Sequence, residues 1–281
     1  MKRSFVKMHG CGNDYIYFDC MNYPLENPEA LAIRLSDRHK SIGGDGIVMI
    51  LPSQCADARM RMFNADGSEG KMCGNAIRCV GKYLFDQGYV DKTEICIETL
   101  SGIKTLNMTI EQNKAVAARV DMGAVVLETK KIPVDLPLDR VVDETVTIGG
   151  KSVSVTCVSM GNPHCVVFVE EVEPLDLSTI GPEYEQSPLF PERINTEFIQ
   201  VIGPRELKMR VWERGSGETM ACGTGACAAV VAATETGHCP KGEPITVHLR
   251  GGDLTIQYTE ETVYMTGQAE LAFTGEVELE G

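Results

Sequence analysis

The chain lacks any excess of positive charge. Its 26 basic residues are outnumbered by 40 acidic residues, which gives a net charge of −14. Nucleic acids and anionic membrane surfaces attract basic proteins, so this balance argues against both as partners. Aromatic residues are also few, at 6% with a single tryptophan, whereas the apolar content of 43% is ordinary for a globular protein.

Long apolar segments are missing as well. Met1-Lys2-Arg3 is followed by a mixed polar strand and not by an apolar stretch of the signal-peptide type. No run approaches the roughly 18 apolar residues that would span a bilayer. Together with an odd number of cysteines, 11, these absences favour a reduced cytoplasm in which most thiols are packed and unreactive. We assign to that unreactive class Cys11, Cys20, Cys55, Cys96 and Cys157.

Cysteine spacing of the zinc type is absent too. His238-Cys239 invites a metal-binding interpretation, but no Cys-x-x-Cys pair accompanies it. Cys73 with Cys79, and Cys222 with Cys227, are spaced for the faces of helices. No lysine stands in a recognisable pyridoxal-binding context. We therefore expect neither a metal nor a cofactor.

The most unusual stretch that is present covers residues 209–231. It predicts a strand, then a glycine-rich turn, then a helix of small residues over 226–233 that follows Cys222. The N-terminus of a helix attracts anions, and its positive end would lower the pKa of a cysteine below about 8.5. The pattern indicates an anion-binding site with a reactive thiol. The alternative is that Cys222 packs as a small hydrophobic residue.

Residues 62–84 repeat this pattern 149 positions earlier. At this one offset Cys73 aligns with Cys222, and Gly74 aligns with Gly223. The match runs without a gap from Gly12 to Gly88, and it includes the pair Gly12-Asn13 against Gly161-Asn162. The chain is therefore predicted to contain two copies of one α/β unit.

The duplication leads to a functional hypothesis. Two similar domains that face one another would present one cysteine to each side of a substrate, and small-molecule sites favour domain interfaces. One thiolate would remove a proton from a carbon acid and the opposing thiol would return one to the other face. We expect one domain over residues 1–122 plus the terminal strand at about 268–281, and a second domain over residues 123–267.

Several shorter motifs leave two interpretations open. Asn13 could contact a ligand or form an Asx-type turn, and the run Gly43-Gly44-Asp45-Gly46 could approach a ligand or be a simple turn. His164 could tune a nearby thiol or serve only the fold. Arg78 is expected to point to solvent or to cap a neighbour. Local signals also predict a helix at 28–37 capped by Asn27, a helix at 75–85, a helical stretch at 174–186 and a strand at 125–127.

Four motifs resemble the diaminopimelate epimerase family, in the family's order and across nearly the whole chain. They are HGCGND (9–14), FNADGSEGKMCGNAIRC (63–79), MGNPHCV (160–166) and VWERGSGETMACGTGACA (211–228). The resemblance implies two similar α/β domains, each a mostly antiparallel sheet wrapped around a central helix. It also implies a homodimer and a cofactor-independent epimerase that converts LL-2,6-diaminopimelate to the meso form in lysine and peptidoglycan-precursor synthesis.

The resemblance also implies roles for particular residues. Cys73 and Cys222 match the acid–base pair, with the first as proton donor and the second as proton acceptor in the LL-to-meso direction and the roles reversed for the return. His164 and Glu213 match residues that tune the thiols. The matched substrate-binding positions are Asn13, Asn64, Gly74, Asn75, Asn162, Asn195, Glu213, Arg214, Gly223 and Thr224.

The chain departs from the family pattern at two positions. Gly46 stands where some members have a glutamine that contacts substrate, and Cys11 stands where many have leucine or alanine. Two other functions stay open on the residues alone. One is another racemase of the same fold, of the proline or hydroxyproline type, although Asn64 and the pair Glu213-Arg214 favour a substrate with a distal amino-acid group. The other is a thiol-redox or metal-binding protein, which the cysteine spacing does not support.

Overall fold

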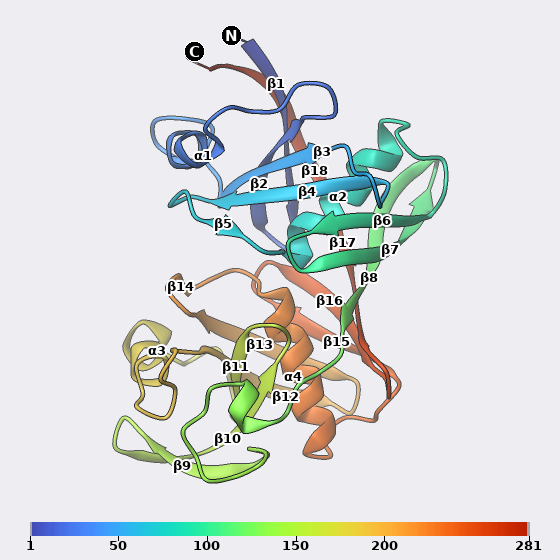
Figure 1. Ribbon diagram of the computed structural model, residues 1–281. Coiled ribbons are helices and arrows are strands. Elements are labelled where there is room, and N and C mark those ends of the chain that lie inside the picture. The colour runs from blue at the N-terminus through green and yellow to red at the C-terminus, as the bar shows by residue number, and fades with distance from the viewer. Residues whose placement is uncertain (1, 280–281) are drawn as a thin grey trace. The chain divides into compact units, whose positions relative to one another are not determined.

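The computed structural model describes residues 2–279 and contains two compact units (Figure 1). Unit 1 runs to Asp121 and resumes at Thr266, and unit 2 is Met122–Met265. The chain passes from one unit to the other inside two paired strands, β8 (Lys114–Gly123) and β17 (Val263–Gln268).

Unit 1 is built from strands around α2, with α1 beside β3 and β4. The pairs β2–β3 and β4–β6 are parallel, and the pairs β1–β2, β3–β4, β4–β5, β6–β7 and β7–β8 are antiparallel. The elements are β1 (Lys2–Gly10), β2 (Asn13–Asp19), α1 (Pro28–Ser36), β3 (Gly46–Leu51), β4 (Ala58–Asn64), β5 (Glu69–Gly70), α2 (Gly74–Asp86), β6 (Glu94–Thr99), β7 (Gly102–Glu111), most of β8, and β18 (Glu270–Glu278).

Unit 2 repeats this order around α4. Here β11–β12 and β13–β15 are parallel, and β10–β11, β12–β13, β13–β14 and β15–β16 are antiparallel. The elements are the 3-10 turn η1 (Thr129–Lys131), β9 (Glu144–Ile148), β10 (Lys151–Ser159), β11 (Pro163–Phe168), α3 (Leu177–Glu185), β12 (Asn195–Gly203), β13 (Glu206–Glu213), β14 (Gly217–Glu218), α4 (Gly223–Glu235), β15 (Pro244–Leu249), β16 (Gly252–Tyr258) and the start of β17.

The predicted duplication is confirmed at the level of elements. Strand β10 begins and ends 149 residues after β1, and the same shift carries α1 onto α3 and α2 onto α4 at both ends. The alternation of parallel and antiparallel pairs is also the same in the two units. The mixed α/β fold class with two repeated halves follows from this correspondence.

The first strands of the two repeats, β1 and β10, each pair with a second neighbour that differs between the units. In unit 2, β10 pairs with β9, which lies directly before it in sequence. In unit 1, β1 pairs instead with β18, which is distant in sequence, and Lys2 lies opposite Glu278. The two ends of the described chain are therefore neighbours in one antiparallel pair, as the N and C marks in Figure 1 show.

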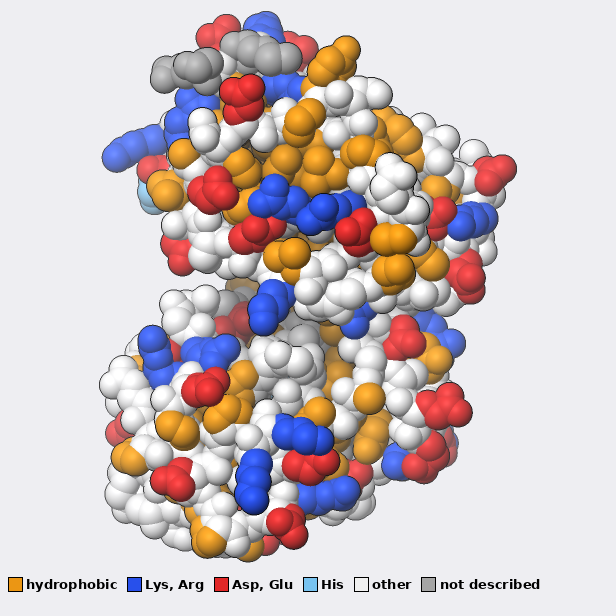
Figure 2. All heavy atoms as spheres, viewed as in Figure 1, with side chains coloured by type: hydrophobic (Ala, Val, Ile, Leu, Met, Phe, Trp, Pro, Cys, Tyr) orange, Lys and Arg blue, Asp and Glu red, His pale blue; other side chains and the backbone are white. Residues whose placement is uncertain are grey.

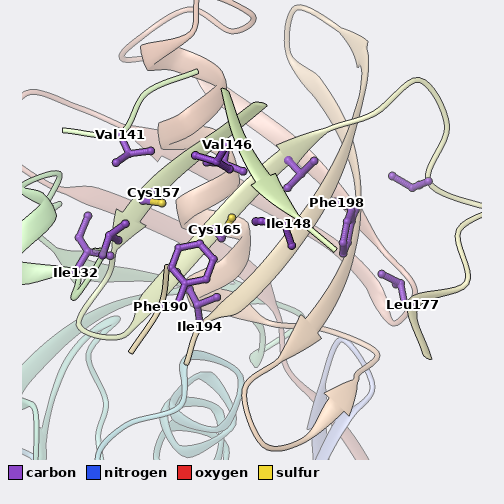
Figure 3. Close-up of a cluster of buried hydrophobic side chains, with 14 residues drawn as sticks. Ile132, Val141, Val146, Ile148, Cys157, Cys165, Leu177, Phe190, Ile194 and Phe198 are labelled. Atoms are coloured by element: carbon purple, nitrogen blue, oxygen red, sulfur yellow. The ribbon is translucent and has the colours of Figure 1, made fainter. Parts of the chain in front are cut away.

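Each unit buries its apolar residues around its own central helix. In unit 2, α4 packs against β10, β11, β12, β13, β15 and β16. Its sequence is dominated by alanine and valine, and small side chains let strands approach a helix on several sides. A second cluster lies beside α3 and includes Cys157 and Cys165, directly opposite one another on β10 and β11, with Phe190, Ile194 and Phe198 (Figure 3).

Several local predictions were wrong. Residues 125–127 form no strand, only an isolated bridge between Val126 and Ser159, whereas β9 was not predicted. Helix α1 begins at Pro28, but Asn27 has a left-handed backbone (φ 49°) and its side chain makes no cap hydrogen bond. Cys55, assigned to the packed thiols, is exposed.

The described residues show no sign of a membrane-spanning helix: within 2–279 no helix is both long and apolar enough. On the face drawn in Figure 2, acidic and basic side chains are interspersed over both units. The negative net charge is thus distributed over that face and is not gathered in one patch there.

Candidate active site

In unit 1, Cys73 occupies the N-cap of α2. Its backbone is extended (φ −133°, ψ 121°), and its sulfur accepts a hydrogen bond from the Ala76 N–H at 3.5 Å. Strand β4 and the short β5 lead into this position, so the chain enters the helix from the sheet. The first N–H groups of a helix have no intrahelical partner and attract anions. Cys73 therefore lies beside a group of donors suited to a carboxylate.

Asn13 is held against Cys73 in a defined orientation. The Cys73 thiol donates to Asn13 Oδ1 at 3.3 Å, and Asn13 Nδ2 donates to Asp45 Oδ2 at 2.7 Å. Because a carboxylate only accepts hydrogen bonds, Asp45 fixes which end of the carboxamide faces the sulfur. Asp45 belongs to the Gly-Gly-Asp-Gly run that was open to interpretation as a simple turn, and sequence reasoning did not assign it a role.

A charged network surrounds this contact. Asp14 pairs with Lys7 at 2.6 Å and with Arg38 at 2.5 Å, and Arg38 also reaches Asp45 at 2.9 Å. Burial acts to raise the pKa of the Asp14 carboxyl, but hydrogen bonds and charge from Arg38 and Lys7 outweigh it and lower the pKa. The carboxylate that follows Asn13 is thus held in its ionised form.

Arg78, expected to point to solvent or to cap a neighbour, is fully buried, so the solvent-exposed alternative is wrong. Its guanidinium donates to Gly74 O at 2.9 Å, to Asn75 Oδ1 at 2.9 Å and to Gln268 O at 3.1 Å. These contacts tie the first turn of α2 to the last residue of β17. Cys11, one of the departures from the family pattern, is buried beside the same guanidinium, with 3.8 Å between Cys11 Sγ and Arg78 Nη2.

The other departure, Gly46, has a steric explanation. It lies opposite Asn64 in the β3–β4 pair, and a Cβ added there would come within 2.0 Å of the Phe63 carbonyl oxygen. No side chain fits this backbone, so a substrate contact from position 46 is excluded in this chain. The Asn64 side chain itself donates to Ser68 Oγ at 3.0 Å.

In unit 2, Cys222 occupies the N-cap of α4 with a similar backbone (φ −126°, ψ 111°). Its side chain makes no cap hydrogen bond, and its sulfur lies 3.5 Å from Thr224 Oγ1. Only 5% of the residue is exposed. The two helix mouths share a backbone geometry but differ in what surrounds the sulfur.

The predicted lowering of the thiol pKa is wrong for Cys222. Burial, followed by the negative charges of Glu213 and Glu197, raises the pKa of Cys222 well above its usual value. The nearby Thr224 hydroxyl and the backbone of Gly225 act to lower this pKa but are outweighed. Burial also raises the pKa of Glu213, whose carboxylate accepts a 2.5 Å hydrogen bond from Thr219 Oγ1.

His164 connects this region to the sheet. Its Nδ1 lies 2.7 Å from Glu197 Oε1, and its Nε2 lies 3.0 Å from Asn162 Oδ1. Both His164 and Glu197 are fully buried. Glu197, on the strand next to His164, was not predicted from the sequence.

Asn195 holds the loop that carries Arg214. Its Nδ2 donates to Pro163 O at 2.8 Å, and its Oδ1 accepts from the Arg214 N–H at 3.0 Å. Glu185, also not predicted, accepts from the Gly215 N–H at 2.9 Å. The Arg214 side chain is exposed and donates to the Glu192 carbonyl at 2.9 Å.

Contacts within each unit bring only some of the predicted residues together: Asn13 meets Cys73 at the mouth of α2, His164 meets Asn162, and Asn195 meets the backbone of Arg214. Unit 1 contains Asn13, Asn64, Cys73, Gly74 and Asn75, and unit 2 contains the remaining predicted positions. The residues that sequence reasoning missed are three carboxylates, Asp45, Glu185 and Glu197, each of which holds a predicted residue or loop in place. Among residues 2–279, no cluster of three or more His, Cys, Asp or Glu side chains is arranged to hold a metal ion.

Comparison with known proteins matches the chain to one family along most of its length. The model of the family described as diaminopimelate epimerase matches residues 5–128 and 156–272. A diaminopimelate epimerase from Acetivibrio thermocellus is 54% identical over 277 residues, which is 98% of each chain. One from Methanococcus maripaludis is 52% identical over 277 residues, covering 98% of this chain and 99% of the relative.

Solved structures with the same fold are more distant in sequence. A probable proline racemase from Agrobacterium radiobacter superposes with a TM-score of 0.71 at 14% identity, covering 99% of this chain and 93% of the other. A phenazine biosynthesis protein of the PhzF family from Bacillus anthracis gives a TM-score of 0.69 at 15% identity, covering 99% and 100%. At such low identity these two structures show the shared fold alone.

Proposed function

The chain belongs to the diaminopimelate epimerase family, and we propose that it is a cofactor-independent epimerase that converts LL-2,6-diaminopimelate to meso-diaminopimelate. The observation that carries the proposal is the repeated helix mouth. Two cysteines 149 residues apart each occupy the N-cap of a central helix, in a chain about half identical to relatives that bear this name.

In the proposed reaction, Cys73 and Cys222 exchange protons with the substrate α-carbon. One sulfur, as the thiolate, removes the α-proton, and the other, as the thiol, delivers a proton to the opposite face of the same carbon. The free backbone N–H groups at Gly74-Asn75 and Gly223-Thr224 stabilise the α-carboxylate, whose charge increases as the carbanion develops. Asn13 orients Cys73 through its hydrogen bond, and His164 is assigned to tuning the thiols.

The remaining predicted positions are assigned to the distal amino-acid group of the substrate. Glu213 and Arg214 supply opposite charges for an ammonium and a carboxylate, and Arg is suited to bidentate carboxylate contact. The asparagines supply donors and acceptors together. They are Asn64, Asn162 and Asn195.

We further propose that the two units are half-site domains, one carrying Cys73 and the other Cys222. The protein is proposed to act as a homodimer in the cytoplasm without nucleic-acid partners. The family resemblance supports the dimer, and the acidic net charge supports the absence of nucleic acid.

Hydrogen exchange at Cα tests the function directly. The protein is incubated in D2O with LL-diaminopimelate and a thiol reductant, and deuterium at Cα and the meso isomer are followed by NMR. We expect both to appear with the wild-type chain and epimerisation to be lost in Cys73→Ala and Cys222→Ala. Cys55→Ala, at an exposed thiol, is the matched control and should retain activity. Exchange with proline but not with diaminopimelate would instead assign the chain to the proline-racemase type.

A further inference from the structure

The fully buried carboxylate of Glu197 has no role in the chemistry described so far. Glu197 lies on β12. Its Oε1 is 2.7 Å from Nδ1 of His164, which lies on the neighbouring parallel strand β11. Its second oxygen, Oε2, is buried without a hydrogen-bond partner among the described residues. A buried carboxylate with an unsatisfied oxygen lowers the stability of a fold, so its presence calls for another explanation.

The repeat shows that the fold itself does not need this pair. At the 149-residue offset, His164 corresponds to Tyr15 and Glu197 corresponds to Val48. Unit 1 builds the same strands around the same helix with these residues. The buried pair is therefore specific to the helix mouth that carries Cys222.

A third difference between the two units, at Gly225, makes room for the Glu197 carboxylate. Gly225, in the first turn of α4, corresponds to Ala76 in unit 1. A Cβ added at Gly225 would lie 2.6 Å from Glu197 Oε1, which real side chains do not allow. Glycine at this position thus leaves the space in which Glu197 reaches His164 below the start of the helix.

We propose that Glu197 is a positioning residue for the epimerase reaction: it holds the proton of His164 on Nδ1 and directs Nε2, then an acceptor, toward the carboxamide of Asn162, which in this tautomer faces it with the donor Nδ2. A carboxylate only accepts hydrogen bonds, so the imidazole nitrogen that faces Glu197 must be the donor. The inference rests on the proposed function, because Asn162 and His164 are assigned there to substrate and thiol. Glu197 acts on the reaction through the imidazole of His164.

Other titratable groups act on the same region. Glu213 on β13 and Cys222 at the mouth of α4 both interact electrostatically with Glu197, and so does Cys165 on β11. Loss of the Glu197 charge therefore removes one of the causes that raise the pKa of Cys222. The limb of the pH–rate profile that reports Cys222 should move to lower pH in Glu197→Gln.

A double-mutant cycle tests whether Glu197 works through His164. We expect Glu197→Gln to lower kcat by about 10- to 100-fold, as for other groups that orient a functional histidine. Glu197→Asp keeps the charge and should restore part of the rate. The double variant Glu197→Gln/His164→Gln should match His164→Gln within about twofold, because the contact is already lost. The proposal would be overturned if Glu197→Gln lowered kcat by the same factor in the wild type and in His164→Gln. It would also be overturned if Glu197→Gln alone did not lower kcat.

A second measurement does not depend on activity. The ¹⁵N NMR signals of His164, assigned by comparison with His164→Gln, report which ring nitrogen carries the proton. Wild-type protein should show the proton on Nδ1, and Glu197→Gln should lose this preference. A proton on Nε2 alone in the wild type would contradict the inference even if the epimerase is active. If the wild type epimerises no diaminopimelate, the proposed function fails while this measurement still decides the tautomer.

Discussion

Cys73 and Cys222 occupy the same backbone position in the two repeats, and the carboxylates of Glu213 and Glu197 raise the pKa of the second. Burial and these charges favour the thiol form of Cys222, which in the proposed reaction is the form that donates a proton. In the LL-to-meso direction implied by the family, Cys222 is the proton acceptor. That direction therefore starts with Cys222 as the thiolate and Cys73 as the thiol. A two-base epimerase needs both states, one for each direction.

The thiol state of Cys222 can be measured by alkylation. Glu213→Gln removes a nearby negative charge, so the pKa of Cys222 should fall and its reaction with iodoacetamide at pH 9 should become several-fold faster. Mass spectrometry reports each cysteine separately. Exposed Cys55 in the same sample is the internal control and should be unaffected. An unchanged or slower rate at Cys222 would show that Glu213 does not raise its pKa.

Asp45 offers a test of how Asn13 is oriented. Asp45→Ala frees the Asn13 carboxamide, and kcat/KM for diaminopimelate should fall by about 10- to 100-fold, the range typical of misplaced contact groups. Asp37→Ala is a suitable control, because Asp37 bonds only the nearby backbone N–H groups of His39 and Lys40 in the recorded contacts. Equal effects of the two substitutions would argue against a specific role for Asp45.

At the level of elements, glycine decides how closely strands and helices approach. Gly46→Ala would drive a Cβ to 2.0 Å from the Phe63 carbonyl and disrupt the β3–β4 pair. We expect the free energy of unfolding to fall by about 3 kcal/mol, measured by urea denaturation. Gly203→Ala, whose added Cβ would meet nothing closer than 3.9 Å, is the matched control and should change it by less than about 0.5 kcal/mol. Similar losses in both variants would contradict the steric explanation.

Elements that recur at the 149-residue offset were predictable from the sequence, because each copy supported the other. The cysteines, the helix mouths and the paired Asn13 and Asn162 were found in this way. Strand β9 has no counterpart before β1 and so had no such support, although its alternating residues and the following Gly149-Gly150 turn are typical of a hairpin. The carboxylates Asp45 and Glu197 were missed because their partners come from other strands, and spacing along the chain does not reveal such contacts.

For the whole molecule, His248 predicts a pH dependence of stability. Hydrogen bonds from its ring to Glu206 and Asp253, 2.8 Å each, raise the pKa of His248 above 6.5. The stability that His248 contributes is therefore present at a pH below its pKa in the unfolded chain. It is lost as the pH rises through the pKa of His248 in the folded protein. His248→Gln should lower the free energy of unfolding by about 0.2–1 kcal/mol at pH 5.5, the range of exposed ion pairs, and leave it unchanged at pH 9. A difference that is constant with pH would exclude this linkage.

The proposed dimer can be examined at β18, where Leu271 and Phe273 are 53% and 49% exposed. Exposed apolar side chains that lie close together on a strand are typical of a contact surface. Light scattering after size-exclusion chromatography should give the mass of a dimer for the wild type and of a monomer for Phe273→Glu. Tyr23→Glu, at an isolated exposed residue, should stay dimeric. A monomeric wild type would refute the dimer.

The pairing of β1 with β18 also bears on how the protein is made. Met122–Met265 is continuous in the chain, so all of unit 2 has been synthesised before β18 leaves the ribosome. Strand β1 must therefore wait for β18, although domains usually fold in order from the N-terminus. The nascent first half therefore carries an unpaired strand edge through most of translation, and an unpaired edge is a site where a second chain can add. For this protein, the exposure to misassembly is greatest at β1 and ends only when β18 pairs with it.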